Sequence, residues 1–488
     1  MPVQPCSTAR RIGEKSFSDE DQQLFASVSS DRNPMHMDPI AARRLMTGRQ
    51  VVHGIHVLIT AIEYWQNNNN AYPIAISCSF DNPVSVGDQV IFTQESRKEN
   101  DVTLEARVNG LLCSQIIITT ARERIPGKSS SDSIDSEPGK EICVRNSLGS
   151  PLDEEPAFHL TKKYLVGLND ADFSVNFPRS YRYFGKQCFA AIPALSYFVG
   201  MICPGLHSIF SSLSFDLNHN SPSADRLVFS IRKYDARVHL FDISFEGCIR
   251  GRLKAFSRPP PQRQPSLDDL SAHIEAKEFS GTRSLIIGGS RGLGEMTAKI
   301  LAAGGGDVVI TYASGLDDAK KICDEINTRG ISACELLKVD LMTDAFHSMS
   351  IDFNALDVVY FFATPRIARK KIEMFEPLLF GEFVEFYINK FYELCVCLEA
   401  NTADKKIKVY FPSTVFVSER PKGMAEYAMA KAAAEILIQE VNKFFKKVSV
   451  VSTRLPRLNT DQTSSILKLS TESNLETLLP VIRSLNRH

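Results

Sequence analysis

A glycine loop between two apolar stretches limits most narrowly what this 488-residue chain can fold into. Residues 284–287 have the pattern of a short buried strand and lead into the loop 288–294, Gly-Gly-Ser-Arg-Gly-Leu-Gly. A helix pattern follows through Ala303, and a second strand pattern runs from Val308 to Tyr312. Strand, glycine loop, helix and strand in this order are typical of dinucleotide-binding sheets. The C-terminal part is therefore predicted to be a Rossmann-like, doubly wound parallel sheet.

The loop also predicts how a dinucleotide would bind. Glycines let the backbone approach a pyrophosphate, and the N-terminus of the following helix favours its negative charge. The second strand ends in Thr311-Tyr312-Ala313-Ser314, without an acid for a ribose 2′-hydroxyl, whereas Arg291 would suit a 2′-phosphate. NADP(H) is therefore predicted as the cofactor rather than NAD. The expected contacts are Gly288, Ser290, Arg291, Gly292, Leu293, Gly294 and, where such folds commonly contact adenine, Asp340.

Tyr427 and Lys431 stand four residues apart in Tyr-Ala-Met-Ala-Lys, so a helix places them on one face. A nearby ammonium group stabilises tyrosinate and lowers the tyrosine pKa, so Tyr427 could pass a proton to a carbonyl oxygen. The plainer alternative is a surface pair without a catalytic role. Together with the GxxxGxG spacing of the glycine loop, this motif resembles the short-chain dehydrogenase/reductases of 3-ketoacyl reductase type. The resemblance extends from Ser284 to the C-terminus.

This resemblance implies further roles. Tyr427 and Lys431 would act in catalysis and also contact the cofactor. Ser413 would hydrogen-bond the substrate oxygen, with Thr414 as the alternative, and Asn389 would support a proton-relay water near Lys431. The remaining expected cofactor contacts are Ala363, Pro456 and Thr460. Where the family usually has Asn-Asn-Ala-Gly, residues 361–364 read Phe-Phe-Ala-Thr, which leaves open a module that binds nucleotide without turnover.

Near the N-terminus, Asp31-Arg-Asn-Pro-Met-His36 places an acid and an imidazole five residues apart. The Asn-Pro between them forms turns readily, so both side chains could point at one water or hydroxyl. A turn-capping aspartate and an ordinary loop histidine are the alternative. Upstream, Ser18 and Asp21 have the spacing of a capping box and predict a helix start.

Val52-His53-Gly54 opens an apolar run that ends at Trp65. Residues 57–65 are apolar around most of a helix and predict a buried helix. Alternating segments at 74–80, 89–95, 103–108 and 113–120 predict strands around it. With Asp31 and His36, this array resembles the MaoC-like (R)-specific enoyl hydratases and dehydratases of hotdog fold, although Ser30 replaces their usual glycine. The resemblance implies that Asp31 and His36 are catalytic and that the Gly54 N–H binds the thioester carbonyl.

Residues 158–256 show the same order of predicted helix and strands as the first unit. Ser77-Cys-Ser-Phe-Asp81 returns as Ser212-Leu-Ser-Phe-Asp216, each after an apolar helix candidate, the second at 193–202 with Pro193 in its first turn. Strand-like runs at 227–233, 238–245 and 249–256 follow. A second hotdog is therefore predicted, non-catalytic because it lacks the Asp-x-Asn-Pro-x-His motif. The expected domains are 1–126 (catalytic hotdog), 127–156 (linker), 157–257 (second hotdog), 258–280 (Pro-rich linker) and 281–488 (reductase domain).

Composition excludes some classes of function. Lys plus Arg number 56 against 57 Asp plus Glu, so no global field favours nucleic acid. No signal peptide is recognised, and no apolar run reaches the ~20 residues needed to span a bilayer, so no membrane association is predicted. The 11 cysteines are scattered, which favours reduced thiols and a cytoplasmic protein. His53 and His56 could suggest a metal pair, but no third ligand has obvious spacing, and no metal is predicted.

These patterns combine into an α+β double hotdog followed by an α/β domain. The predicted protein is a bifunctional enzyme acting on acyl-CoA or acyl carrier protein thioesters, with a homodimer as a possible assembly. One alternative is a hydratase that carries an inactive nucleotide-binding module. The other is a non-catalytic scaffold that binds acyl thioesters.

Overall fold

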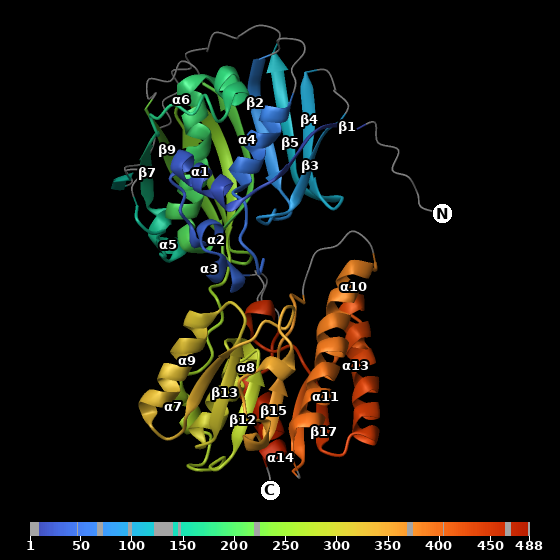
Figure 1. The fold of residues 1–488 in the computed structure, drawn as a ribbon. Coiled ribbons are helices and arrows are strands. Elements are labelled where there is room, and N and C mark those ends of the chain that lie inside the picture. The colour runs from blue at the N-terminus through green and yellow to red at the C-terminus, as the bar shows by residue number, and fades with distance from the viewer. Residues whose placement is uncertain are drawn as a thin grey trace. The chain divides into compact units, whose positions relative to one another are not determined.

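The computed structural model (Figure 1) describes residues 9–45, 47–65, 72–95, 100–121, 140–144, 148–218, 225–367, 374–403, 405–463 and 470–486. The chain divides into two compact units, one that extends to Pro260 and one that begins at Pro261. Among the described residues, no helix is long and apolar enough to cross a membrane.

The N-terminal unit is built, within its described residues, on an eleven-stranded sheet. The strand order is β1-β3-β4-β5-β2-β8-β11-β10-β9-β7-β6. The strands are β1 (Arg10–Ser16), β2 (Tyr72–Phe80), β3 (Gln89–Gln94), β4 (Asp101–Val108), β5 (Leu111–Ala121), β6 (Lys140–Val144), β7 (Lys162–Gly167), β8 (Ser208–Leu217), β9 (Arg226–Asp235), β10 (Leu240–Glu246) and β11 (Ile249–Ser257).

The sheet has an internal repeat that meets at its centre. β2 pairs antiparallel with β8, and Cys78 lies opposite Leu213 with Ser77 opposite Ser214. Outward from this pair, the first half runs β2-β5-β4-β3-β1 and the second half runs β8-β11-β10-β9-β7, which is the same succession. The paired strands carry the two copies of the sequence repeat, so the repeat corresponds to two related halves with a local two-fold axis between them.

Helices cover one face of this sheet. α4 begins at Gly54, is buried from Ile55 to Ile62, and contacts α6. The hydrophobic core lies between these helices and the strands. The helices are α1 (Asp19–Ser29), α2 (Pro34–Met37), α3 (Pro39–Arg43), α4 (Gly54–Tyr64), α5 (Pro156–Leu160), α6 (Pro178–Tyr197), the π-helix η1 (Phe198–Ile202) and the short 3-10 helix η2 (Gly205–His207).

Two expectations for this unit were wrong in detail, and one strand was not expected. Pro193 lies inside α6 rather than in its first turn, because the polar residues 178–187 hide the helix start from an apolar pattern. The predicted linker 127–156 contains β6, which pairs with β7, while Leu148 and Leu152 pack against the core. The edge strand β1 was not predicted, because charged residues interrupt its alternation; charged side chains are common on edge strands, where they oppose aggregation.

The C-terminal unit contains a six-stranded parallel sheet in the order β14-β13-β12-β15-β16-β17. This order is that of a doubly wound dinucleotide-binding fold, as predicted. The strands are β12 (Arg283–Ile287), β13 (Asp307–Tyr312), β14 (Cys334–Lys338), β15 (Val358–Phe361), β16 (Ile407–Thr414) and β17 (Val448–Leu455). The helices that position the site are α8 (Gly292–Ala303), α9 (Leu316–Arg329), α10 (Pro377–Val384), η5 (Glu385–Lys390), α11 (Phe391–Asn401), α12 (Phe416–Glu419), α13 (Ala425–Phe444), η6 (Asp461–Thr463) and α14 (Asn474–Asn486).

The predicted Pro-rich linker 258–280 belongs largely to this unit. The short helix α7 (Leu267–Ser271) begins with a capping box at Ser266, and Leu267 and Leu270 are buried beside α8. Ile274 and Phe279 join the same core. Polar and proline residues outnumber these four apolar anchors, which is why composition alone indicated a linker.

Candidate active sites

The turn after α1 carries the first candidate site. α1 begins with the predicted capping box, in which Ser18 and Asp21 exchange hydrogen bonds. The helix ends at Ser30, which has φ 64° and donates its N–H to the Ala26 carbonyl. This left-handed conformation favours glycine, the residue that the resemblance leads one to expect there. Ser30 adopts this left-handed conformation without a glycine.

The Asp31 carboxylate is enclosed by residues of the second half of the sheet unit. Asp31 is 1% exposed, and the Ser196 hydroxyl donates to its Oδ2 at 2.7 Å. The Asn33 N–H donates to Oδ1 at 3.1 Å, and Gly200 packs so closely that a Cβ there would overlap the carboxylate. Burial raises the pKa of Asp31, while His36 and these hydrogen bonds act in the opposite direction.

His36 is held as a neutral base. Its Nδ1 lies 2.7 Å from the Val51 carbonyl oxygen. Because a carbonyl only accepts, Nδ1 carries the hydrogen and Nε2 keeps its lone pair. Burial lowers the pKa of His36, and the Asp31 carboxylate partly offsets that effect. The structure thus brings the predicted pair together, with ligand-type atoms of Asp31, His36 and also His53 within 4.8 Å of one another.

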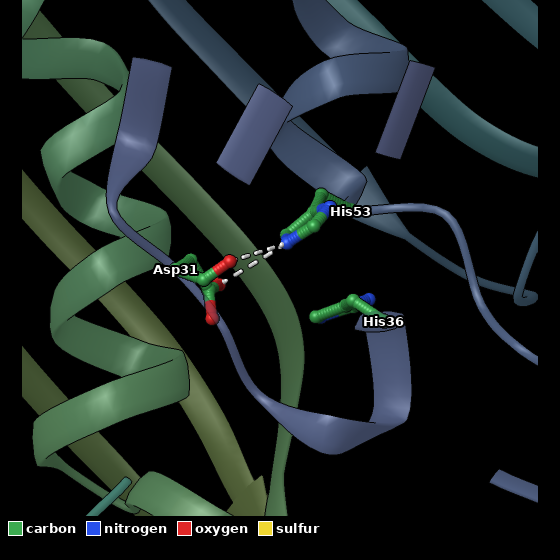
Figure 2. Close-up of side chains that lie close together, drawn as sticks. All are labelled: Asp31, His36 and His53. Carbon is green, nitrogen blue, oxygen red and sulfur yellow. Dashed lines mark hydrogen bonds and ion pairs between the residues drawn. The ribbon is translucent and has the colours of Figure 1, made fainter. Parts of the chain in front are cut away.

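His53 is the member that sequence reasoning did not assign, although its Val-His-Gly motif was noted. Its ring stacks on His36 with centroids 3.8 Å apart and an interplanar angle of 24°. Figure 2 shows its Nε2 directed at Asp31, 3.2 Å from the backbone carbonyl oxygen and 3.8 Å from Oδ2. Burial lowers the pKa of His53 well below its ordinary value, so the ring is neutral and Nε2–H donates to Asp31.

The spacing of these three residues would admit a metal ion, but their orientation favours acid–base chemistry. Metal ligands converge on one point, whereas stacked imidazole rings present their nitrogen atoms side by side. His56 does not complete such a site, because its ring stacks on Phe25 and packs edge-on against Phe17. Burial lowers the pKa of His56 to about 3.

Two backbone features complete this site. The Asn33 amide donates to the carbonyls of Gly200 at 2.8 Å and Gly205 at 3.1 Å, which fixes the turn to the second half. Gly54 is the first residue of α4, where an N–H has no helical acceptor. The Phe80 ring lies against it, and a Cβ there would come within 2.9 Å of that ring. Gly54, which the resemblance implies binds the thioester carbonyl, therefore has its N–H at a helix start.

The second candidate site lies on α13. Tyr427 is buried, and the Thr414 side chain hydrogen-bonds it. Burial raises the pKa of Tyr427 to about 12, which is opposite to the lowering expected from a nearby ammonium group. Lys431 donates from Nζ to the Pro412 carbonyl at 2.7 Å and lies 3.9 Å from the centroid of the Tyr387 ring. Burial lowers the pKa of Lys431 to about 7.

Two of the predicted reductase residues lie elsewhere. The Ser413 hydroxyl donates to Glu435, so Thr414, the alternative, takes the place beside Tyr427. Asn389 is exposed and its amide donates to Glu385. Sequence reasoning missed Tyr387, which covers Lys431. Tyr387 and Asn389 both lie in the π-helical segment η5, and Asn389 had been assigned from the resemblance alone.

The predicted nucleotide loop has the close packing that glycines permit. Gly288 has φ +82°, and a Cβ there would lie 2.8 Å from the Ala363 nitrogen, while a Cβ on Gly294 would overlap the Gly288 carbonyl. The Thr460 methyl lies 3.7 Å from the place of a Cβ on Gly292. Gly288, Gly292, Gly294, Ala363 and Thr460 therefore meet at one edge of the sheet.

Arg291 was expected to bind a 2′-phosphate, but in the structure it lies beside an acid. It is the N-cap of α8, and its Nη1 lies 3.7 Å from Oδ2 of Asp461. Oδ1 of Asp461 accepts the Gln262 N–H at 2.8 Å. Asp340 follows β14 and accepts the Met342 N–H at 3.0 Å. The other predicted contacts, Ser290, Leu293 and Pro456, are buried or partly buried.

Comparisons with known proteins match different parts of the chain. A short-chain dehydrogenase from Burkholderia cenocepacia, solved in complex with NADP, is 18% identical, with 43% of this chain and 91% of that chain covered and a TM-score of 0.35. A probable tetrahydroxynaphthalene reductase from Zymoseptoria tritici is 31% identical over 94 residues, 18% of this chain and 35% of the relative. The mitochondrial 3-hydroxyacyl-[acyl-carrier-protein] dehydratase of Arabidopsis thaliana is 35% identical over 81 residues, 15% of this chain and 46% of the relative.

The chain thus spans less than half the length of these two curated relatives. A family model described as "MaoC like domain" matches residues 4–110. That range holds the turn with Asp31 and His36 as well as α4. The N-terminal part of this chain is therefore a MaoC-like domain.

Proposed function

We propose that the chain is a bifunctional acyl-thioester enzyme in which a double hotdog catalyses (R)-3-hydroxyacyl dehydration or enoyl hydration. The C-terminal unit would reduce 3-ketoacyl thioesters with NADPH. The two reactions share the 3-hydroxyacyl thioester, which gives their fusion a chemical reason. The MaoC-like match and the names of the two relatives, a dehydratase acting on acyl carrier protein and a reductase, support this combination.

The buried Asp31–His36 pair carries the proposal for the first unit. In the hydration direction, the two side chains hold one water, and His36 Nε2 accepts a proton from it as its oxygen bonds to C3 of the enoyl group. Asp31, whose pKa burial raises, is suited in its protonated form to supply the proton that C2 gains, and transfer of the proton from His36 back to Asp31 restores both groups. The Gly54 N–H donates to the thioester carbonyl, where enolate-like charge develops. Dehydration follows the same steps in reverse.

For the second unit, Tyr427 donates a proton to the ketone oxygen, and Thr414 positions that oxygen beside it. Close packing around Gly288 and Gly294 and the start of α8 fit a dinucleotide pyrophosphate. Bound NADPH would supply the hydride. Arg291 could contact a 2′-phosphate after leaving its contact with Asp461.

A second candidate function is a hydratase whose C-terminal unit binds nucleotide without turnover. The position of Lys431 favours it, because Nζ is directed to the Pro412 carbonyl and covered by Tyr387. The raised pKa of Tyr427 points in the same direction. Binding of NADPH without oxidation by any 3-ketoacyl thioester would support this candidate. Acyl-chain binding with no reaction in either unit would instead indicate the scaffold.

One assay tests the bifunctional proposal. The protein is supplied with a 3-ketoacyl thioester and NADPH, and we expect both hydroxyacyl and enoyl products. Tyr427→Phe should leave the ketone untouched but still hydrate added enoyl thioester. With His36→Ala, the reaction should stop at the hydroxyacyl stage, and Asp31→Asn should behave in the same way. Each substitution should lower the rate of hydration by roughly 100-fold or more.

Chiral analysis of the product trapped by His36→Ala is the decisive measurement. An (R)-hydroxyacyl thioester would fit the hydratase, whereas an (S) product would mean that the two sites cannot work in series. A folded His36→Ala protein that hydrates a crotonyl thioester at the original rate would contradict the proposed catalytic role of the Asp31–His36 pair.

A further inference from the structure

Arg258, the residue after β11, is a buried cation that the proposed mechanism does not use. It is 5% exposed, and its Nη2 donates to the Leu206 carbonyl at 3.0 Å. Its Nε is buried without a hydrogen-bond partner. Among the residues that the structure describes, Arg258 forms no ion pair.

A buried guanidinium without a negative partner is energetically costly, and proteins retain such charges where something pairs with them. Burial lowers the pKa of Arg258 only to about 10, so it remains charged at neutral pH. The charge of nearby Asp153 raises the pKa of Arg258, but the two side chains form no ion pair; Oδ1 of Asp153 lies 3.4 Å from His207 Nε2, and the Asp153 side chain is 65% exposed. His207 Nδ1, also buried, lacks a partner too.

Arg258 lies beside the Asp31–His36 pair. The Leu206 carbonyl that accepts from Arg258 also lies 3.4 Å from the side-chain nitrogen of Asn33. Asn33 stands in the turn between Asp31 and His36. The positive charge of Arg258 also contributes to lowering the pKa of His36. A negatively charged group bound at Arg258 would therefore belong to a molecule that occupies the dehydratase site.

We propose that Arg258, with His207 beside it, forms an oxyanion subsite that binds a negatively charged group of the thioester substrate. The inference rests on the proposed hydratase function. Two parts of a substrate could supply the oxyanion: a carboxylate on the acyl chain, or the phosphate of the carrier arm. Both would form charge-assisted hydrogen bonds with the guanidinium. The competing explanation is that Arg258 only clamps the Leu206 carbonyl.

Two matched pairs of substrates separate these sources. The first pair is glutaconyl and 5-methylhex-2-enoyl N-acetylcysteamine, which differ in a carboxylate against an isopropyl group; longer ω-carboxylated homologues extend it. The second pair is 5-methylhex-2-enoyl phosphopantetheine and 5-methylhex-2-enoyl pantetheine, which differ only in the phosphate. In the unmodified protein, we expect kcat/KM for hydration to favour the anionic member of one pair by roughly 10- to 100-fold.

Arg258→Met should abolish that preference while leaving the neutral substrates within about 3-fold of their original rates. Arg258→Lys should keep part of the preference. The matched control is Arg252→Met, which removes an exposed arginine from the preceding strand β11 and should change nothing. Loss of preference in the first pair would assign the subsite to an acyl carboxylate, and loss in the second to the carrier phosphate.

Two results would overturn the subsite. Equal losses for charged and neutral substrates in Arg258→Met would show a structural clamp. The subsite would also be overturned if the unmodified protein preferred neither anionic substrate. This result does not depend on whether the variant folds. Hydration of the neutral thioesters alone upholds the proposed hydratase while refuting the subsite; hydration of none refutes both.

Discussion

The two candidate sites differ in how their polar groups are used. In the first, Asp31 and His36 each have hydrogen bonds that fix their orientation, and these leave His36 Nε2 with a lone pair for a substrate. In the second, Tyr427 and Lys431 have the expected spacing, but Lys431 is directed at a backbone carbonyl. A motif thus specifies residue types in both units, whereas the packed neighbours decide whether those groups face a substrate.

The first site is also assembled from both halves of the sheet unit. Ser196 and Gly200 come from the second half, which lacks its own acid–histidine motif, yet they hold the Asp31 carboxylate. The chemistry proposed for the first half would therefore depend on residues of the second. Among the described residues, the groups in contact with Lys431 at the second site, Tyr387, Phe411 and the Pro412 carbonyl, belong to its own unit.

Gly200→Ala tests this dependence and should have the largest effect. A Cβ at residue 200 would overlap the Asp31 carboxylate, which must then leave Ser196 and the Asn33 N–H. We expect hydration to fall roughly 100-fold, because small misplacements of catalytic groups have effects of that size. Gly167→Ala is the control, since a Cβ there has nothing within 4 Å. Equal rates in the two variants would show that the second half does not position the carboxylate.

Lys431→Met probes the second site through stability. The folded pKa of Lys431, about 7, lies below its ordinary 10.5 because the side chain is buried. Between these values the unfolded chain binds more protons, so the stability of the unmodified protein rises with pH. The variant should therefore be more stable near pH 7, and its advantage should shrink by about 2 kcal/mol by pH 9. Denaturant unfolding at both pH values measures this. An advantage that does not change with pH would mean that Lys431 is solvated.

Thr414→Val and Ser413→Ala form the next comparison, within one strand. Both residues of β16 contact α13, Thr414 at Tyr427 and Ser413 at Glu435, which lies further along the same helix. We expect Thr414→Val to lower ketone reduction by roughly 10-fold, while Ser413→Ala stays within about 2-fold. Single-turnover NADPH oxidation would measure both. The reverse order would restore Ser413 as the catalytic hydroxyl.

Local signals in the sequence predicted local structure well. The capping box at Ser18, the glycine loop and the apolar run of α4 each formed as expected, since their causes lie within a few residues. Contacts between distant segments could not be found this way: Ser196 reaches Asp31 across 165 positions. Asn389 was assigned from the resemblance alone, which could not show that Tyr387 is the residue of η5 that covers Lys431. A choice between neighbours such as Ser413 and Thr414 depends on which side chain of α13 each hydroxyl contacts, and a motif does not contain that information.

The ion pair between Arg291 and Asp461 allows the smallest and most selective test of the second site. The two side chains lie 3.7 Å apart at the start of α8, so the Asp461 carboxylate competes with a cofactor 2′-phosphate for the guanidinium. Arg291→Ala should narrow a preference for NADPH over NADH by roughly 5-fold, because a charge-assisted contact is lost. Asp461→Asn should widen it by a similar factor, since the amide still accepts the Gln262 N–H but no longer neutralises Arg291. Binding titrations with both nucleotides would measure these ratios without requiring turnover. Shifts of the same sign in the two variants, or equal affinities in the unmodified protein, would remove Arg291 from cofactor selection.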